Sequence, residues 1–407
     1  MQFMPDTKSF ERILGKVNIQ EYETSRNFLN GAVTYLSPYI THGYESMPNL
    51  VFQFKKQGLT PQHKLYAEFG WREYYYHVWS HLGNGIFQDI RPALPEVNYQ
   101  SFLPKDILQA KTGLAPIDLA ITTLYETGYL HNHARMWLAS YLIHFRKIHW
   151  RTCADWMYGY LLDGDLASNH LSWQWVGSTF SSKPYLFNAE NITKYAPVEW
   201  HCTNSILDQS YEALDAIARS NEILDNSFVL KQLARNNTWN ETQTHIPPLL
   251  SLPPEALLKK YQVVADLKLF DMSKSNNFKL VHPWDLKGTR DQKVQLGILH
   301  TPFFQEFPWS EQRWEFVLNR LSQLCDVIVL GDLQKILIPY LKAHKSIRID
   351  VQHTYNPHYA DLLLEISKTN DTLMQPMDRF LANPDQFCPS FTKFWQLVVK
   401  KEKFPKH

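Results

Sequence analysis

The chain carries at residues 163–175 the sequence DGDLASNHLSWQW, which places two carboxylates, a carboxamide and two tryptophans within thirteen residues. The carboxylates and Asn169 can hydrogen-bond a polar ring system, and the indoles offer flat faces beside it. A buried turn followed by core tryptophans would explain only the apolar part of this run. The run therefore predicts a site for an aromatic cofactor with a second aromatic ligand close by.

The bulk properties narrow the class of protein. A length of 407 residues favours two domains, and a net charge of +1 gives no strong overall attraction to nucleic acid. A local basic rim could still bind DNA phosphates. The four cysteines show no C-x-x-C spacing, so we expect reduced thiols in a cytoplasmic protein without a metal site. No apolar run approaches the roughly 18 residues of a membrane helix, and we expect a monomer that does not bind membranes.

Hydrophobic spacing changes along the chain. The first half has helical periodicity, and the predicted helices are 64–82, 116–126, 131–150 and 154–162, with a further amphipathic helix at 205–223. From residue 278, short apolar runs at 278–281, 294–299, 326–330 and 347–351 alternate with helical stretches at 311–324, 333–343 and 359–368. This alternation is typical of an open, mostly parallel α/β sheet. The pattern predicts a multidomain α and α/β protein, with an all-helical domain followed by a smaller α/β domain.

Three other helical segments carry polar groups that could meet a ligand. Residues 33–39, VTYLSPY, follow Tyr22 and Arg26 and place hydroxyl and backbone N–H groups before a helix, where phosphates can bind. Residues 68–75, EFGWREYY, put an acid, an indole and a cation on one helical face. Residues 127–136, TGYLHNHARM, put an amide, a cation and a thioether on one stripe. Taken singly, each segment fits an ordinary helix cap or a helix-packing polar group.

Together the segments L-S-P-Y, E-x-x-W-R-E-x-Y-Y, T-G-x-x-H-N-x-x-R-M and D-G-D-L-A-S-N-x-x-x-W-Q-W resemble the photolyase/cryptochrome flavoprotein family in order and spacing. The similarity covers roughly residues 20 to 190. In that family a helical domain holds FAD in a U-shaped conformation. Photolyases flip a pyrimidine dimer out of DNA into the pocket above the flavin, and the light-excited reduced flavin donates an electron that splits the cyclobutane ring.

The resemblance implies a set of FAD-binding residues and a role for several of them. Tyr22 and residues 33–37 should lie along the phosphates and the ribityl chain, and Asn169 should lie near the flavin N5. The implied FAD-binding residues are Tyr22, Val33, Thr34, Tyr35, Leu36, Ser37, Arg72, Asn132, Arg135, Asp163, Asp165 and Asn169.

The resemblance also implies residues that face DNA and residues that act in the reaction. The DNA-facing set is Arg26, Glu68, Trp71, Asn132, Met136 and Trp175, in which two indoles would clamp a flipped dinucleotide. The catalytic set is Glu68, Asn169, Trp173 and Trp150, of which the two tryptophans match the inner and middle members of the family's electron-transfer chain. No outer tryptophan is evident, because the segment before residue 111 contains Tyr99 but no tryptophan in its place.

The C-terminal part resembles the antenna domain with which family members usually begin. The similarity lies in residues 310–318, 329–332, 355–360 and 389–395. It implies a smaller, Rossmann-like open parallel α/β domain and an exchanged domain order equivalent to circular permutation. The expected divisions are 1–200 for the FAD-binding domain, 201–275 for a helical connector and 276–407 for the antenna-like domain. Asn356 replaces an acidic residue that often holds a folate, so the antenna chromophore stays unknown.

The resemblance favours a deoxyribodipyrimidine photolyase, an FAD-dependent, light-driven lyase that acts on DNA containing cyclobutane pyrimidine dimers. Asn132 and Met136 fit that class better than the six-four class, which has a histidine at each place. The alternative is a cryptochrome-like flavin photoreceptor without repair activity, and a third hypothesis is a flavoprotein that has lost both activities. Val33, Tyr129 and Ser172 depart from the family pattern near the flavin.

Overall fold

The computed structural model describes residues 3–226, 246–266, 275–290 and 293–399. The chain forms two compact units: a sheet unit of residues 1–19, 34–83 and 248–407, and a helical unit of residues 20–33 and 84–247. The predicted boundaries near residues 200 and 275 divide the chain differently, and they stay a prediction. Within the expected connector, residues 227–245 and 267–274 lie outside the described residues.

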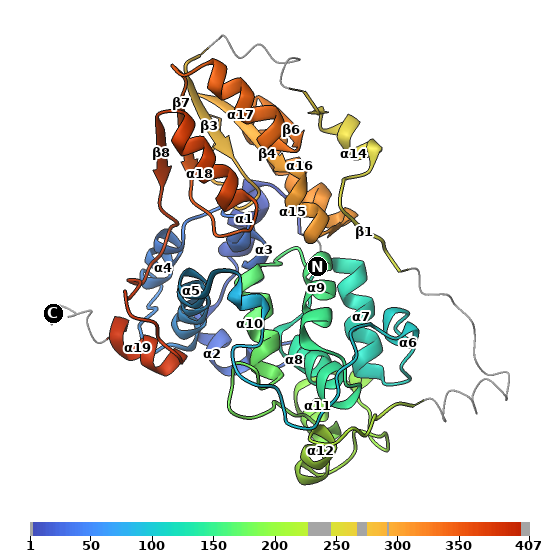
Figure 1. Ribbon diagram of the computed structural model, residues 1–407. Coiled ribbons are helices and arrows are strands. Elements are labelled where there is room, and N and C mark those ends of the chain that lie inside the picture. Colours follow the sequence, from blue (N-terminus) through green and yellow to red (C-terminus); the bar gives the residue numbers. More distant parts are fainter. Residues whose placement is uncertain (1–2, 227–245, 267–274, 291–292, 400–407) are drawn as a thin grey trace. The chain divides into compact units, whose positions relative to one another are not determined.

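The sheet unit contains elements from both ends of the chain (Figure 1). Its helices are α1 (Thr7–Leu14), α3 (Ser37–Thr41), α4 (Met47–Lys55), α5 (Lys64–Leu82), α14 (Glu255–Lys260), α15 (Thr301–Glu306), α16 (Glu311–Leu324), α17 (Leu333–Ala343), α18 (Tyr359–Thr369) and α19 (Phe391–Val399). Its strands are β1 (Leu249–Leu250), β2 (Val263–Val264), β3 (Asn277–Val281), β4 (Val294–His300), β5 (Trp309–Ser310), β6 (Val327–Gly331), β7 (Arg348–Gln352) and β8 (Thr372–Gln375).

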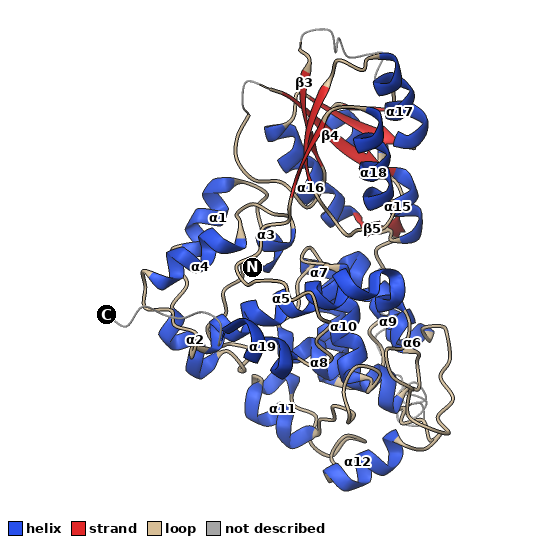
Figure 2. Cartoon of the chain, turned by 60° about the vertical axis from the view of Figure 1, so that its left-hand side comes forward, coloured by secondary structure: helices blue, strands red, loops and turns tan. Residues whose placement is uncertain are grey.

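A six-stranded parallel sheet in the order β2-β6-β4-β3-β7-β8 forms the core of this unit. The chain moves outward from β3 through β4 to β6, and then returns to the other side of β3 for β7 and β8. Figure 2 shows α16 on one face of the sheet and α17 and α18 on the other. The four predicted strand runs and the three predicted helices are confirmed to within two residues. The edge strand β2 was not predicted, because a two-residue strand has no detectable periodicity.

The central strands are buried on both faces. In β4, every residue after Val294 is buried, and in β6 only Gly331 keeps intermediate exposure. Near-continuous apolar runs are expected where helices cover both faces of a parallel sheet. The short apolar runs in the sequence therefore reflect strands that are covered by helices on both faces.

The helical unit contains α2 (Ile19–Ser25), which begins at the unit boundary, η1 (Gly83–Phe87), α6 (Lys105–Leu108), α7 (Ala115–Thr127), α8 (Asn132–Ser140), η2 (Tyr141–Phe145), α9 (Trp150–Tyr160), α10 (Leu166–Val176), α11 (Ala189–Tyr195), η3 (Val198–Trp200) and α12 (Tyr211–Ala218). Residues 3–226, all of them described, contain no strand. The prediction of a helical first half is confirmed.

The predicted helix 131–150 is wrong in its last turn. The chain follows α8 with the π-helical turn η2 and leaves the helix at Arg146, and Lys147 has a left-handed backbone with φ 53°. The Lys147 ammonium donates to the carbonyls of His144, Ile217 and Ala218 at 2.7, 2.8 and 3.1 Å, which stabilises the break. Trp150 therefore begins α9, and the helix predicted at 154–162 starts four residues earlier.

The predicted helix 205–223 is also shorter in the structure. Only Tyr211–Ala218 are helical, after Ser210 caps the helix by accepting a hydrogen bond from the Ala213 N–H at 3.3 Å. The preceding residues form turns, and Asn204 has φ 62°. Such turns use short polar side chains that sequence periodicity does not detect.

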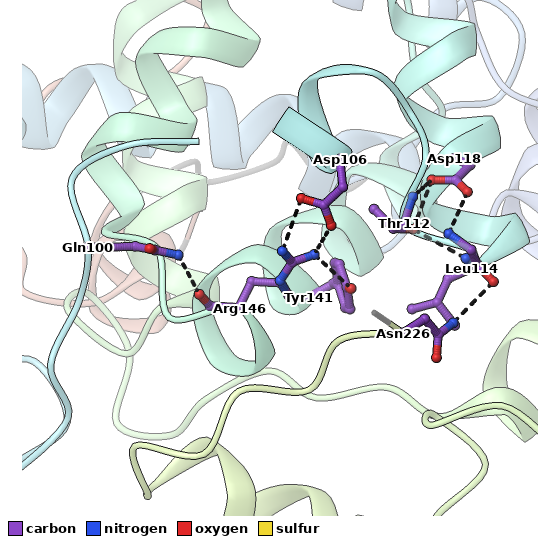
Figure 3. A network of polar contacts seen from close by, with 9 residues as sticks. Gln100, Asp106, Thr112, Leu114, Asp118, Tyr141, Arg146 and Asn226 are labelled. Carbon is purple, nitrogen blue, oxygen red and sulfur yellow. Dashed lines mark hydrogen bonds and ion pairs between the residues drawn. The ribbon is translucent and has the colours of Figure 1, made fainter. Parts of the chain in front are cut away.

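A polar network holds the segment before α7 against η2 in the helical unit (Figure 3). The Arg146 guanidinium donates to both carboxylate oxygens of Asp106, at 2.7 and 3.1 Å. Asp118 accepts from the N–H and the hydroxyl of Thr112, each at 2.8 Å. Asn226 donates to the Gly113 carbonyl at 3.1 Å. Because these side chains satisfy polar groups of the loops on either side of α6, those loops keep a defined path.

Candidate functional site

The run at residues 163–175 forms a turn and the helix that follows it. Asp163 and Gly164 follow α9, and the Gly164 N–H donates to the Leu161 carbonyl at 3.0 Å. Asp165 is the N-cap of α10, and its carboxylate accepts from the Ser168 N–H at 2.7 Å. Both carboxylates are buried. The local sequence therefore places two acids and Asn169 within the first turn of one helix and the turn before it.

Arg135 joins this run from α8. Its Nη2 donates to both carboxylate oxygens of Asp163, at 3.0 and 2.8 Å, and its Nε donates to the Leu130 carbonyl at 2.7 Å. The Asp163 side chain is 4% exposed and that of Arg135 is 24% exposed. The Leu162 N–H donates to the Gly128 carbonyl at 2.8 Å, and Gly128 has φ 64°. The TG and DG turns are therefore joined by backbone as well as by charge.

Asn169 and Ser168 supply further polar atoms on the first turn of α10. The Asn169 amide nitrogen donates to the Ala154 carbonyl on α9 at 2.9 Å. The Ser168 hydroxyl is buried and has no hydrogen-bond partner within the described part of the chain. A buried polar atom of this kind calls for a partner such as a ligand or water. Carboxylates, a carboxamide, a guanidinium and an unpaired hydroxyl form a donor and acceptor set that fits the polar parts of FAD.

Asn132 and Met136 lie one helical turn apart on α8, as predicted. The Asn132 amide nitrogen is 3.6 Å from the Met136 sulfur. His131 caps the helix by accepting from the His133 N–H at 3.1 Å. Burial lowers the pKa of His131 to about 4, so this cap is uncharged at neutral pH. Trp175 lies on α10, and its ring is 6.0 Å from that of Tyr185.

Trp150 and Trp173 lie on the neighbouring helices α9 and α10. The Trp150 indole N–H donates to Asp89 at 2.6 Å, and its ring meets that of His170 at 87° with centroids 6.3 Å apart. Trp173 is 3% exposed. The protein therefore holds both indoles in its interior.

Tyr99 lies near the start of α9. Its ring contacts His149 edge to face at 6.4 Å, and His149 immediately precedes Trp150. Burial, with a smaller contribution from Asp89, raises the pKa of Tyr99 to about 12. Tyr99 is thus a neutral phenol beside the residue that caps α9.

The sheet unit holds Glu68, Trp71 and Arg72, all on α5 as predicted. The Trp71 ring stacks on Phe391 with centroids 4.1 Å apart and planes 9° apart. The Arg72 guanidinium lies 5.2 Å from the Tyr76 ring centre and donates to the Tyr76 hydroxyl at 3.4 Å. The side chains of the 68–75 motif therefore lie on α5, and the ring of Phe391, far away in the sequence, packs against Trp71.

The predicted phosphate-binding segment spans the boundary between the units. Val33 ends a segment of the helical unit, which also contains Tyr22 and Arg26, and Thr34 begins a segment of the sheet unit. The Thr34 hydroxyl accepts from the Leu36 N–H at 3.3 Å, and Tyr35 has φ 53°. Ser37 begins α3, which is only five residues long. The phosphate-binding role of residues 33–37 stays a prediction.

The sequence prediction missed a cavity in the sheet unit. It lies where β3 and β7 end, and it is lined by residues that include His282, Trp284, His353, Thr354 and Arg379. Its volume of about 70 Å³ is small beside the roughly 300–1,000 Å³ of most small-molecule pockets. The reversal of strand order between β3 and β7 could have indicated the place, but only after the topology was known.

The four cysteines are free and buried. No group of three or more His, Cys, Asp or Glu side chains in the described ranges is arranged to hold a metal ion. Among those residues, no helix is both long and apolar enough to cross a bilayer.

Motifs from both units match a known domain. Residues 65–200 match the family model of the FAD binding domain of DNA photolyase. This region of the chain is therefore similar to the photolyase/cryptochrome family. The predicted resemblance is confirmed from residue 65 to 190, and the match includes the 68–75, 127–136 and 163–175 motifs. The resemblance at residues 20–64 stays a prediction.

Curated photolyases are similar over part of their length. The chain is 30% identical over 160 residues to a deoxyribodipyrimidine photo-lyase of Streptomyces griseus, a match that covers 39% of this chain and 35% of that protein. It is 33% identical over 184 residues to one of Agrobacterium fabrum, covering 42% and 38%. These matches span less than half of either photolyase.

Solved photolyase structures overlap with the chain only in part. A bacterial class III photolyase from Agrobacterium tumefaciens is 27% identical and covers 46% of this chain and 41% of its own, with a TM-score of 0.40. The similarity to the photolyase/cryptochrome family therefore depends on the sequence matches.

Proposed function

We propose that the chain repairs cyclobutane pyrimidine dimers in DNA by a light-driven reaction that uses reduced FAD. The observation that carries the proposal is the cluster at the start of α10. Asp163, Asp165 and Asn169 lie within the first turn of this helix and the turn before it, and Arg135 binds Asp163. This cluster lies within the residues that match the photolyase FAD domain. Bound reduced FAD supplies, on illumination, the electron that opens the cyclobutane ring.

The chain's polar residues hold the cofactor in this proposal. Asp163 and Asp165 accept hydrogen bonds from the flavin and adenine portions, and Asn169 lies near the flavin N5. Arg135 and Arg72 face the diphosphate or the flavin edge. Tyr22 and residues 33–37 follow the phosphates and the ribityl chain. The paired geometry of Arg135 and Asp163 supports this assignment, because it orients the carboxylate before any ligand binds.

The damaged DNA would be read by stacking and by hydrogen bonds. Trp71 and Trp175 stack on the flipped pyrimidines, and Asn132 hydrogen-bonds their carbonyl edges. Met136 fills the apolar contact beside them. Glu68, in its protonated form, stabilises negative charge that develops on the dimer by donating a hydrogen bond. Arg26 binds a phosphate of the DNA backbone.

Trp173 and Trp150 would supply electrons to the bound flavin from the protein. Their burial on adjacent helices supports this role, because it excludes water from the path.

We also place the protein in the cytoplasm as a monomer. The α/β part, which follows the FAD domain in this chain, corresponds in our proposal to a Rossmann-like antenna domain in exchanged order. Its strand order around β3 supports that correspondence.

A cryptochrome-like photoreceptor without repair activity is the second candidate. The net charge of +1 favours it, since photolyases must attract the DNA backbone. Ser172 and Val33, which depart from the family pattern beside the flavin, favour it as well. Both candidates require the same flavin site, so flavin binding does not separate them.

The deciding experiment illuminates the purified, reduced protein with an oligonucleotide that contains a thymine dimer. Recovery of thymine absorbance should rise with light dose and stay flat in darkness. Equal recovery in light and darkness from a flavin-loaded, reduced protein would exclude the lyase. It would leave the photoreceptor and the flavoprotein without either activity.

A Trp175→Ala variant tests the assignment of the stacking residue. It should weaken binding to dimer-containing DNA and keep the flavin-to-protein ratio of the parent. Loss of flavin from this variant would show that Trp175 belongs to the cofactor site.

A further inference from the structure

The C-terminal helix α19 packs tightly on α5 at the residue next to Trp71. A Cβ atom at Gly70 would lie 2.0 Å from Cζ3 of Trp395, so only glycine permits this approach. The Trp395 ring also meets Tyr66 at 76°, with centroids 5.9 Å apart. The absence of a side chain at Gly70 therefore allows α19 to pack closely on α5.

One turn along, Phe391 covers one face of the Trp71 indole. The two rings are nearly parallel, 9° apart, with centroids at 4.1 Å. Phe391 is itself held by Tyr74 at 6.0 Å and by Trp395 at 5.1 Å. Trp71 keeps an intermediate exposure, so part of the indole remains accessible.

The segment that leads into α19 is fixed to α5 by polar contacts. The Arg379 Nε donates to the Glu73 carboxylate at 2.7 Å, and its Nη2 donates to the Glu73 carbonyl at 2.6 Å. His77 is 2.8 Å from the Asn383 amide oxygen and accepts from the Cys388 N–H at 2.9 Å. Phe391 is therefore presented to Trp71 by an anchored segment.

We propose that Phe391 is a positioning residue that holds the Trp71 indole in the orientation needed to stack a flipped pyrimidine. The inference rests on the proposed function and extends the DNA-facing site beyond the matched domain, to α19. A side chain that is already held loses less conformational freedom on binding, so preorganisation raises affinity without adding a contact to the ligand. Aromatic pairing supplies the holding interaction.

The experiment compares binding of flavin-loaded protein, in the dark, to an oligonucleotide with and without a thymine dimer. Phe391→Leu keeps an apolar side chain and removes the ring. It should lower affinity for the dimer about 5-fold, within the range expected for one aromatic pair, and leave affinity for undamaged DNA unchanged. Phe391→Tyr should restore the preference. Phe387→Leu is the matched control, because Phe387 packs on His77 and His81 of the same helix.

A second measurement reads the Trp71 environment without DNA. In protein labelled with 5-fluorotryptophan, the Trp71 fluorine resonance is assigned by its absence in Trp71→Phe. Phe391→Leu should shift this resonance, Phe391→Tyr should return it toward the parent position, and Phe387→Leu should leave it in place. An unshifted resonance in Phe391→Leu would overturn the positioning role.

The outcomes separate the two proposals. A parent protein without any preference for the dimer overturns the proposed function, and the inference with it. A parent preference that persists in Phe391→Leu while Trp71→Ala abolishes it overturns only the positioning role. Tighter dimer binding by Phe391→Leu overturns it too, because Phe391 would then block the indole.

Discussion

Arg135 binds Asp163 through a single nitrogen that donates to both carboxylate oxygens, at 3.0 and 2.8 Å. The pair joins α8 to the turn before α10 and leaves the Asp163 side chain 4% exposed. Two of the motifs that identify the FAD domain are thus connected by charge in the protein itself. The Asp163 carboxylate is oriented by the fold before a cofactor binds.

We expect Arg135→Ala to destabilise the protein, because it removes the cation from a buried carboxylate. Breaking such a pair costs about 3 kcal/mol in the free energy of unfolding. Urea unfolding measures this loss, and flavin absorbance should show a lower flavin-to-protein ratio. Arg219→Ala is the control, since the pair of Arg219 with Asp215 is about half exposed and should contribute under about 1 kcal/mol. Equal losses in the two variants would contradict the prediction.

Gly70→Ala should destabilise the packing of α19 on α5, because the new methyl group overlaps Trp395. Overpacking of this kind costs about 1–3 kcal/mol. Urea unfolding of Gly70→Ala, Trp395→Leu and the double variant forms a cycle, and the double variant should be more stable than the sum of the single losses predicts. Additive losses would show that the two residues are not in contact.

Arg379→Met should strengthen the pH dependence of stability that comes from Glu73. Burial raises the pKa of Glu73 above 4.5, and Arg379 opposes that shift. Without the guanidinium the folded-state pKa rises further, so the folded state binds a proton that the unfolded state releases. Stability then falls as pH rises above the unfolded pKa. The difference in unfolding free energy from the parent should therefore be larger at pH 8 than at pH 5, and a constant difference would contradict this.

Acid should destabilise the parent protein through its buried histidines. His144 is fully buried and donates from Nε2 to the Val176 carbonyl at 2.8 Å, and burial lowers its pKa from 6.5 to about 4. Because the unfolded state takes up the proton first, stability is complete above pH 6.5 and is lost as pH falls toward 4. At pH 5 this histidine accounts for a loss of about 2 kcal/mol.

The matched variant is His144→Gln, which keeps a donor and cannot titrate in this range. Its unfolding free energy should fall less than that of the parent between pH 7 and pH 5. Parallel pH profiles would show that other groups cause the acid loss.

Trp150→Phe should slow the light-driven reduction of bound flavin, because it removes the middle indole of the proposed electron path and its bond to Asp89. The flavin content should stay at the parent level. The visible absorbance of the flavin under constant illumination measures the rate. Trp156→Phe, on the same helix, should reduce at the parent rate. If Trp150→Phe reduces its flavin as fast as the parent does, Trp150 is not part of the electron path.

Much of the local structure followed from the sequence. Helical periodicity predicted α5 at its observed bounds, Lys64–Leu82, and apolar runs located β3, β4, β6 and β7. The prediction failed where a single backbone conformation decided the outcome, as at Lys147, which ends the helix with φ 53°. Periodicity reports which face of an element is buried, and it does not report one residue with an unusual dihedral angle.

The sequence by itself determined the FAD-domain motifs, because their spacing is local and each motif lies on one helix or turn. Only the tertiary structure decided what packs against them. Glu73 and Arg379 are 306 residues apart, and their bond helps to bring Phe391 onto Trp71. The apolar face of a helix can be covered by any segment of suitable shape, so the hydrophobic pattern of the helix does not predict which segment packs on it. The close contact between Gly70 and Trp395 selects α19 as the partner of α5, and this contact exists only in the folded chain.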